Sequence, residues 1–312
     1  FSSRRRHTRY QSLSRGLGDV YKRQILKEQA IQKHHIDLQK NSYIASTTFR
    51  QHLFGPNHPY GRNTRDVDIS FLDPEILKEY HQGAIKSSKM DIHVAGKFDD
   101  ELLHQIEDHL GSLPANHINY DEELSPGGDH IQKVVISKKD SMQSSLRIGN
   151  LSIKKSHPDF PKLLVTNELL GGFFGSRLMK NIREDKGYTY GIYSQLAPLH
   201  HDAYFIIGAD VIKESRGKSI KEVRKEVKRL IAEPPSADEL QTVKNYMIGT
   251  FQSELNTAFD LADKFRGIYY NGLDYSYYQN LFGIVRNITP QEVSETAGQY
   301  LRPDSFLTVA VG

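Results

Sequence analysis

An internal repeat constrains the fold of this 312-residue chain more than any other feature of its sequence. Residues 73–96 begin with DPEI and end with MDIHVAG, and residues 289–312 begin with TPQE and end with SFLTVAVG. Each copy places a capping residue before a proline at the first helical position and closes on a short apolar run. The interval from proline to final glycine is 22 residues in both copies (96 − 74 and 312 − 290), and the copies lie 216 residues apart (290 − 74). Equal order and spacing predict two homologous domains.

The repeat also predicts the domain boundaries. Residues 115–130 (ANHINYDEELSPGGDH) are polar and rich in turn formers, which is typical of a linker, so the second domain is expected over residues 131–312. Subtracting the repeat interval places the start of the first domain about 85 residues before residue 1 (131 − 216 = −85). Residues 25–114 are therefore interpreted as the C-terminal half of an incomplete first domain. We expect a protease to digest that half first, because its sheet would lack strands.

The first 24 residues differ in composition from the rest of the chain. They contain seven Lys/Arg and one acidic residue, a balance of +6, so that the remaining residues sum to −3 (3 − 6). A basic arm can bind nucleic acid or an anionic membrane. The segment has neither the apolar stretch of a signal peptide nor an amphipathic period. We interpret residues 1–24 as a non-native leader, and we expect no nucleic-acid partner.

Composition excludes several other classes of protein. No run of about 18 apolar residues is present, so a membrane-spanning helix is not expected. Cysteine is absent, which excludes disulfides, thiolate metal sites and cysteine nucleophiles. The sequence predicts a soluble protein and leaves its compartment, cytoplasm or periplasm, undecided.

The pattern of the second domain is typical of an α+β fold. Strands are predicted at residues 131–137, 144–153, 188–196 and 203–211, and helices at residues 159–170 and 176–186. A further helix carries the apolar stripe Ile220, Val223, Val227 and Leu230, and Ser236-x-x-Glu239 is predicted to form a capping box that opens a long helix. This order predicts, for each of the two domains, a mainly antiparallel sheet with helices on one face.

The chain has fourteen histidines, but their spacing does not predict a metal site. None begins His-x-x-Glu-His or His-Glu-x-x-His, the spacings that place two imidazoles on one helical face. His34-His35 and His200-His201 are adjacent pairs, whose side chains diverge on a helix or a strand. No serine triad, phosphate loop or dinucleotide fingerprint occurs at useful spacing. We therefore predict no catalytic residue and no metal ligand in this chain.

Residues 167–191 (NELLGGFFGSRLMKNIREDKGYTYG) form the most specific stretch of the sequence. Gly171 and Gly172 would permit a tight helix–loop–helix and a close approach of backbone to another element. The stretch resembles the C-terminal-domain signature of the insulinase/pitrilysin zinc metallopeptidases and their mitochondrial-processing-peptidase relatives. Residues 53–62 (LFGPNHPYGR) resemble a segment late in the first domain of that family. The resemblance covers residues 25–312.

The resemblance implies a clamshell of two similar domains around an unfolded peptide. In the family, the first domain holds zinc through His-x-x-Glu-His, and the second contributes an arginine and a tyrosine seven residues apart. These correspond here to Arg183 and Tyr190, which would bind a peptide carbonyl and the developing oxyanion. The residues alone leave an alternative open. Arg183 could pair with Glu184 or Asp185 on a helix surface while Tyr190 packs within a strand.

The chain departs from the family pattern where a distal zinc-binding glutamate is expected. By the 216-residue interval that region corresponds to residues 24–37 (QILKEQAIQKHHID), where Glu28 is the single glutamate and lies out of register. Such a substitution is typical of the family's non-catalytic partner subunits. The leading hypothesis is a protein that binds extended peptide for a zinc-bearing homologue, or within a homodimer. It would have no cofactor in this chain, and zinc is expected in the complete protein or its partner. The alternatives are a fragment of an active zinc endopeptidase and a structural subunit like those of respiratory complexes.

Overall fold

The computed structural model describes residues 3–87, 91–112, 126–128 and 131–312, with side chains described from residue 21 onward except at residues 84–87. The α-helices are α1 (Ser3–Gln39), α2 (Asn41–Phe54), α3 (Asp66–Ser70), α4 (Pro74–Ser87), α5 (Asp100–Leu110), α6 (Phe160–Asn167), α7 (Arg216–Ala232), α8 (Ala237–Ser253), α9 (Ala258–Tyr269), α10 (Ser276–Asn287) and α11 (Pro290–Tyr300). Shorter π or 3-10 segments are η1 (Glu168–Gly172), η2 (Met179–Asp185), η3 (Lys213–Ser215) and η4 (Pro303–Ser305). The strands are β1 (Lys133–Ile136), β2 (Gln143–Leu151), β3 (Thr189–Pro198), β4 (Ala203–Ile212) and β5 (Leu307–Val311). The predicted linker lies outside the described residues apart from positions 126–128.

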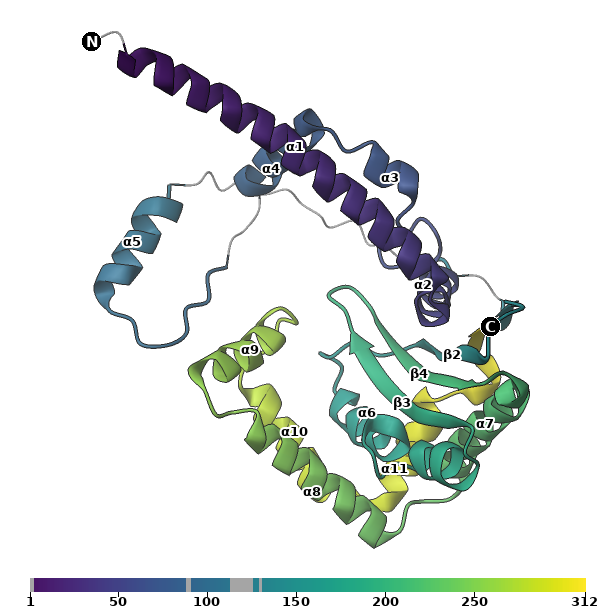
Figure 1. The fold of residues 1–312 in the computed structure, drawn as a ribbon. Coiled ribbons are helices and arrows are strands. Elements are labelled where there is room, and N and C mark those ends of the chain that lie inside the picture. The colour runs from purple at the N-terminus through teal and green to yellow at the C-terminus, as the bar shows by residue number, and fades with distance from the viewer. Residues whose placement is uncertain (1–2, 88–90, 113–125, 129–130) are drawn as a thin grey trace.

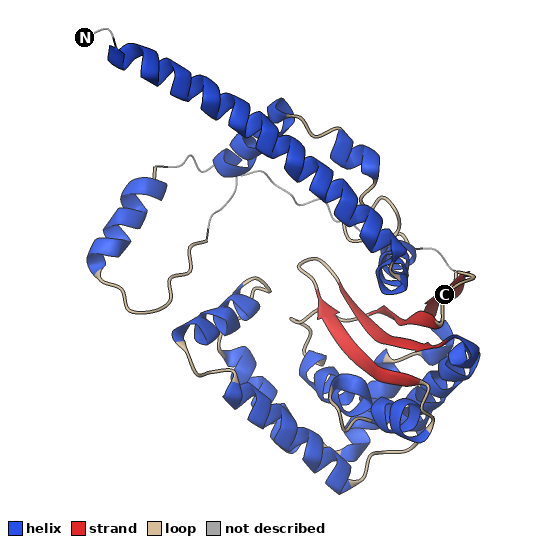
Figure 2. Cartoon of the chain, in the orientation of Figure 1, coloured by secondary structure: helices blue, strands red, loops and turns tan. Residues whose placement is uncertain are grey.

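The strands, red in Figure 2, form one sheet. Their order in the sheet is β1-β5-β2-β4-β3. β1 pairs with β5 in parallel, and the other pairs are antiparallel. The prediction of an α+β fold with a mainly antiparallel sheet is therefore confirmed. Buried and exposed side chains alternate along the edge strand β3. Ile192, Ser194 and Leu196 are buried, while the residues between them are exposed.

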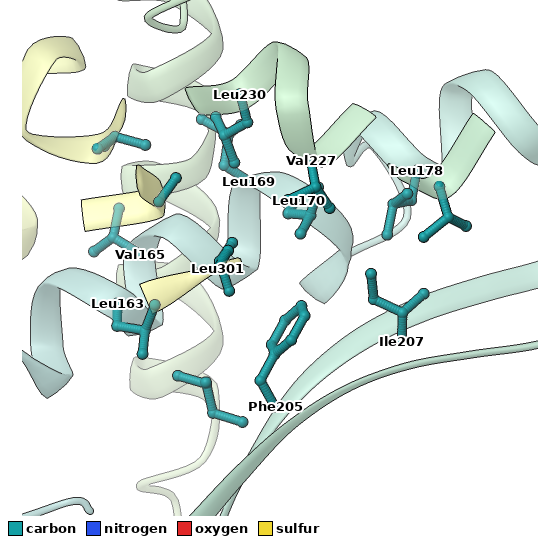
Figure 3. Packing of buried hydrophobic residues seen from close by; sticks show 14 of the residues in the cluster. Leu163, Val165, Leu169, Leu170, Leu178, Phe205, Ile207, Val227, Leu230 and Leu301 are labelled. Atoms are coloured by element: carbon teal, nitrogen blue, oxygen red, sulfur yellow. The ribbon is translucent and has the colours of Figure 1, made fainter. Parts of the chain in front are cut away.

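Helices pack on one face of the sheet around the larger hydrophobic core. Figure 3 shows Phe205 and Ile207 of β4 pointing toward leucines and valines of α6, η1 and α7. The predicted apolar stripe of α7 lies in this core, where Val223, Val227 and Leu230 have no exposed surface. The period of 3.6 residues that identified the helix thus also identified its buried face.

A helix from the first half of the chain covers the opposite face of the sheet. Phe49 and Phe54 of α2 pack with Val309 and Val311 of β5 in a second hydrophobic cluster. Arg147 of β2 fastens this helix, since its Nε donates to Ser46 Oγ at 2.9 Å. The sequence predicted that helices would pack on one face of the sheet only, whereas α2 packs on the other face. The physical reason lies in β5, whose five residues are all buried, because a strand apolar on both sides must be covered on both sides.

The two copies of the repeat share their helices but not their strands. Asp73 Oδ1 accepts from the backbone N–H of Ile76, and Thr289 with Glu292 forms a full capping box at the start of α11. The second copy then enters the sheet as β5, whereas residues 91–96 are not in a strand. β5 lies between β1 and β2, while no strand of the described ranges lies beside residues 91–96. A strand needs such neighbours to satisfy its backbone groups.

Residues 66–83 and 91–110 contain no buried side chain, and Figure 1 shows α5 apart from the sheet and its helices. α3 and α5 contain no buried residue. The exposed fractions of Phe71 and Tyr80 are 72% and 76%. α1 contacts α3 through polar groups, with Lys27 Nζ donating to the carbonyl of Ser70 at 2.5 Å. None of the helices in the described ranges is long and apolar enough to cross a membrane.

Candidate functional site: a cleft at the free edge of the sheet

The signature stretch folds as the predicted helix–loop–helix, with π-helical turns on both sides of the loop. α6 continues into η1, and η2 ends where Gly187 adopts a φ of 62°, which favours glycine. A Cβ on Gly171 would lie 2.7 Å from the backbone nitrogen of Ser194 in β3. Gly171 therefore lets the helix backbone touch the edge strand. π turns inside helices frequently mark functional sites.

A buried ion pair fastens this segment to α8. Arg177 donates from Nε and Nη2 to the two carboxylate oxygens of Glu239 at 2.8 and 2.9 Å. Burial alone would raise the pKa of Glu239, but the hydrogen bonds from Arg177 outweigh it and hold that pKa below its usual value. The predicted capping box at the start of α8 is half formed. Ser236 accepts from the Glu239 backbone N–H, while the Glu239 carboxylate binds Arg177 instead.

Arg183 and Tyr190 line one cleft of about 1170 Å³, together with the turn at residues 139–143. Tyr190 lies in a β-bulge, because Thr189 pairs with Val211 and Ile192 with Ala209, so that two residues of β3 oppose one of β4. Thr189 Oγ1 donates to the Asp210 carbonyl at 2.6 Å and braces the bulge. The bulge directs the Tyr190 side chain outward, where 90% of it is exposed.

The Arg183 guanidinium lies over the Phe174 ring, 4.5 Å from its centroid. Within the described ranges, no carboxylate lies at ion-pair distance from Arg183, so the alternative pairing with Glu184 or Asp185 is not formed there. Stacking on Phe174 fixes the plane of the guanidinium and leaves its N–H donors directed at its rim. The fold therefore brings Arg183 and Tyr190 to one cleft. Their predicted role in binding substrate stays a prediction.

β3 forms one edge of the sheet, since it pairs with β4 and with no other described strand. Tyr193 and Gln195 are exposed along it, on the face opposite Ile192. Part of this edge is already occupied, because the Ile192 backbone N–H donates to Met179 Sδ at 3.4 Å and the Gly191 backbone N–H donates to Thr189 Oγ1 at 3.1 Å. Sequence analysis identified the strand but could not place it at the edge, because strand order depends on contacts between distant segments.

The second family-like segment, residues 53–62, lies away from this cleft and joins α2 to the β3–β4 hairpin. His58 stacks on Phe54 with ring centroids 5.2 Å apart. The Tyr60 backbone N–H donates to His58 Nδ1 at 3.2 Å, so the neutral ring carries its proton on Nε2, 3.5 Å from Asp202 Oδ2. Tyr60 Oη accepts from the backbone N–H of His201 at 3.2 Å. This segment is a structural joint between the two halves of the chain.

The histidines whose side chains the structure describes do not assemble a metal site. His35 Nε2 lies 2.6 Å from Asp66 Oδ2, and the rings of His200 and His201 stack with centroids 4.4 Å apart. Over the described ranges, no group of three or more His, Cys, Asp or Glu could hold a metal ion. Zinc in proteins takes at least three protein ligands. The residues described thus do not fit zinc, and no chemical step is assigned to a metal here.

The fold is that of an inactive peptidase domain. It is similar to the structure of a peptidase M16 inactive domain from Pseudomonas fluorescens, with a TM-score of 0.79 and 22% identity over 93% of this chain and 70% of that chain. It is also similar to a Helicobacter pylori protease structure, with a TM-score of 0.75 and 17% identity over 94% of this chain and 71% of that chain. The sequence profile of the peptidase M16 inactive domain matches residues 72–247. The chain belongs to this family.

Relatives found by sequence comparison carry names that refer to peptidases. The non-peptidase homologue YmxG of Helicobacter pylori is 27% identical over 83% of this chain and 61% of its own length. A Bacillus subtilis protein described as an uncharacterized zinc protease, also YmxG, is 26% identical over 69% of this chain and 51% of its own length. The chain thus spans about half to three fifths of these relatives. Residues 72–247 are thus of the kind that this family describes as its inactive domain.

Proposed function

We propose that this chain binds an extended peptide along the cleft of Arg183 and Tyr190, as the non-catalytic half of a peptidase assembly whose zinc lies in a homologous subunit. The observation that carries the proposal is the placement of both side chains in one cleft beside the edge strand β3. Arg183 would donate to a peptide carbonyl, and Tyr190 would donate to a second acceptor.

The shape and polarity of the cleft support a peptide ligand. A second hollow of about 610 Å³ shares Lys139, Asp140 and Asp210 with the cleft and extends it to Asn41 and Ser42 at the start of α2. Together they form a groove that carries charges of both signs and many hydrogen-bonding groups. A polar groove of this kind suits the backbone of an extended chain better than a compact apolar ligand.

Open space next to Tyr190 supports an extended conformation for that peptide. Gly191 has no atom within 4 Å of a Cβ position, which leaves room for a second backbone there. The backbone N–H groups of Gly191 and Ile192 already donate to Thr189 Oγ1 and Met179 Sδ. The peptide backbone would therefore be bound mainly by the Arg183 and Tyr190 side chains.

Peptide binding by the full chain tests the proposal. A fluorescein-labelled, unstructured peptide is titrated with the parental chain, Arg183→Lys and Tyr190→Phe, and anisotropy is recorded. Lysine keeps the charge but loses the planar fork, so Arg183→Lys should weaken binding about tenfold. Tyr190→Phe should weaken it about fivefold, because one neutral hydrogen bond contributes about 1 kcal/mol.

Matched controls are available at Arg266 of α9 and at Tyr270, the residue after α9. Arg266→Lys and Tyr270→Phe make the same chemical changes at exposed positions outside the cleft. They should change binding by less than about twofold. Equal binding by Arg183→Lys, Tyr190→Phe and the parental chain would refute the assignment of the cleft.

The name of the Bacillus subtilis relative supports a second candidate function, that of a zinc protease whose metal ligands precede this chain. The two candidates differ in where the metal lies. If the protein is a zinc protease, a version extended by its upstream residues would bind one zinc and cleave peptide. If it is a peptide-binding subunit, that version would bind peptide and need a homologous subunit for cleavage.

A further inference from the structure

A pocket on the far side of the helical layer contains an unusual carboxylate. Glu168 of η1 lies in a cavity of about 240 Å³ whose other walls come from α6, α8 and α10. Those walls are mostly apolar or aromatic: Leu164, Tyr246, Met247, Phe251, Leu281 and Phe282. The cavity shares no lining residue with the cleft of Arg183 and Tyr190. It is therefore a separate site from the proposed peptide cleft.

The Glu168 carboxylate has no partner inside the described part of the protein. No described residue donates a hydrogen bond to it or lies at ion-pair distance from it. Burial raises its pKa to about 6, with no opposing charge or hydrogen bond. The carboxylate is thus mostly ionised at pH 7.5 while it faces apolar walls. An ionised carboxylate in such surroundings is costly unless a cation pairs with it.

The backbone of the signature stretch makes room for this carboxylate. A Cβ on Gly172 would lie 2.4 Å from Glu168 Oε2, so any larger residue would displace the carboxylate. Phe173 stacks on Tyr246 of α8, with ring centroids 4.9 Å apart, and fixes the wall beside it. The sequence singled out Gly172 for its backbone freedom. In the structure, its missing side chain leaves the space that the Glu168 carboxylate occupies.

Two residues that line the pocket, Phe251 and Glu254, already hold a cation. Lys264 pairs with Glu254, and its Nζ lies over the Phe251 ring, 5.2 Å from the centroid. An ammonium is thus held there between a carboxylate and an aromatic face. Glu168 offers the same combination deeper in the pocket, with Tyr246 and Phe282 in the walls and without a lysine of its own.

We propose that the pocket between η1, α8 and α10 binds an organic cation: an ammonium or guanidinium group on an apolar body of side-chain size, paired with Glu168. A metal ion does not fit, since the pocket offers two carboxylates, of which Glu254 is already paired, and no histidine. The cation could be a free amine or the basic side chain of a peptide, which present the same chemistry to the pocket.

Binding of benzylamine and of benzyl alcohol to the full chain tests the proposal, measured by isothermal titration calorimetry at pH 7.5 and pH 5. The two probes have the same shape, and benzylamine alone carries a charge. Benzylamine should bind at least tenfold more tightly at pH 7.5, and its advantage should shrink severalfold at pH 5, where Glu168 is mostly protonated. The other titratable groups that line the pocket are Tyr246 and Glu254, the latter paired with Lys264.

Glu168→Gln should abolish the preference for the amine, and Gly172→Ala should weaken it severalfold without removing the charge. Glu295→Gln, an exposed change on α11, is the matched control, and circular dichroism checks that each variant is folded. Competition by a lysine-containing peptide, but not by its norleucine analogue, would assign the cation to a peptide side chain. Its failure to compete would assign the site to free amines.

Equal binding of amine and alcohol, or an unchanged preference in folded Glu168→Gln, would overturn the proposal. Tyr190→Phe should leave benzylamine binding unchanged, so failure here is distinguishable from failure of the peptide cleft.

Discussion

Two glutamates of this chain show how environment alone sets a protonation state. Burial raises the pKa of Glu168 to about 6. The Thr289 backbone N–H, together with Lys162, lowers the pKa of Glu292 to about 2. Glu292 closes the capping box of α11 at a partly exposed position, where the helix N-terminus stabilises its negative charge. The same side chain is therefore destabilising when ionised in one place and stabilising in the other.

Replacing Glu168 should change how stability depends on pH. Because its folded pKa lies above the ordinary value of 4.5, the folded state binds the proton more tightly than the unfolded state does. Its contribution to stability is complete below pH 4.5 and is lost as the pH rises through about 6. The loss amounts to at most about 2 kcal/mol. Glu168→Gln should therefore raise the free energy of unfolding at pH 8 and change it little at pH 4.5.

Urea denaturation at both pH values measures this difference, with Glu295→Gln as the control. A stabilisation of Glu168→Gln that is equal at pH 4.5 and pH 8 would show that proton binding to Glu168 is not its cause.

At the scale of elements, the signature stretch and α8 depend on one ion pair. Arg177 is 6% exposed and binds Glu239 through two hydrogen bonds. Arg177→Ala should lower the free energy of unfolding by about 3 kcal/mol, because it leaves a partly buried carboxylate without a cation. Arg65→Ala, which removes the exposed partner of Asp68, should cost less than about 1 kcal/mol.

Thermal or urea unfolding of the two variants checks this contrast. The double variant Arg177→Met with Glu239→Leu should recover much of the lost stability, because it removes both charges from the site. A cost for Arg177→Ala no larger than that for Arg65→Ala would mean that the pair does not hold α8.

At the scale of the whole molecule, the first half of the chain has two parts of unequal stability. α2 is buried against the sheet through Ala45, Phe49 and Phe54, whereas α5 has no buried residue. Limited proteolysis should therefore cleave within residues 66–112 first and leave residues 41–54 protected together with the sheet. The sequence alone predicted early digestion of all of residues 25–114. Because α2 packs against the sheet, we now expect early digestion of residues 66–112 but not of residues 41–54.

Mass spectrometry of the fragments over time measures the order of cleavage. The fragment that carries α2 should copurify with residues 131–312 after the first cuts. Release of α2 as early as α5 would mean that its contact with β2 and β5 is weak.

Metal content is a further property of the whole chain. The described ranges hold no group of three ligands, and none of the fourteen histidines occurs at a zinc-binding spacing. We expect the purified, dialysed chain to contain no stoichiometric zinc and to leave unstructured peptides uncleaved. Elemental analysis and a peptide-cleavage assay check both expectations. One zinc per chain after mild chelation would contradict them.

The sequence by itself predicted many elements of the second half. Two runs rich in strand formers predicted β3 and β4, the stripe of Ile220, Val223, Val227 and Leu230 predicted the buried face of α7, and proline after a capping residue predicted α4 and α11. These features are local, because period and capping act over a few residues. Arg183 and Tyr190 were identified through the resemblance to a family, because the residues alone left their roles open.

Only the tertiary structure decided which surfaces these elements share. It placed α2 on the second face of the sheet, left residues 91–96 without strand partners, turned the Glu239 carboxylate from its capping box to Arg177, and enclosed Glu168 between α6, α8 and α10. Each outcome depends on groups dozens of residues or more apart in the chain. Burial and competition for hydrogen bonds between such groups arise from packing, and packing leaves no periodic signal in a single sequence.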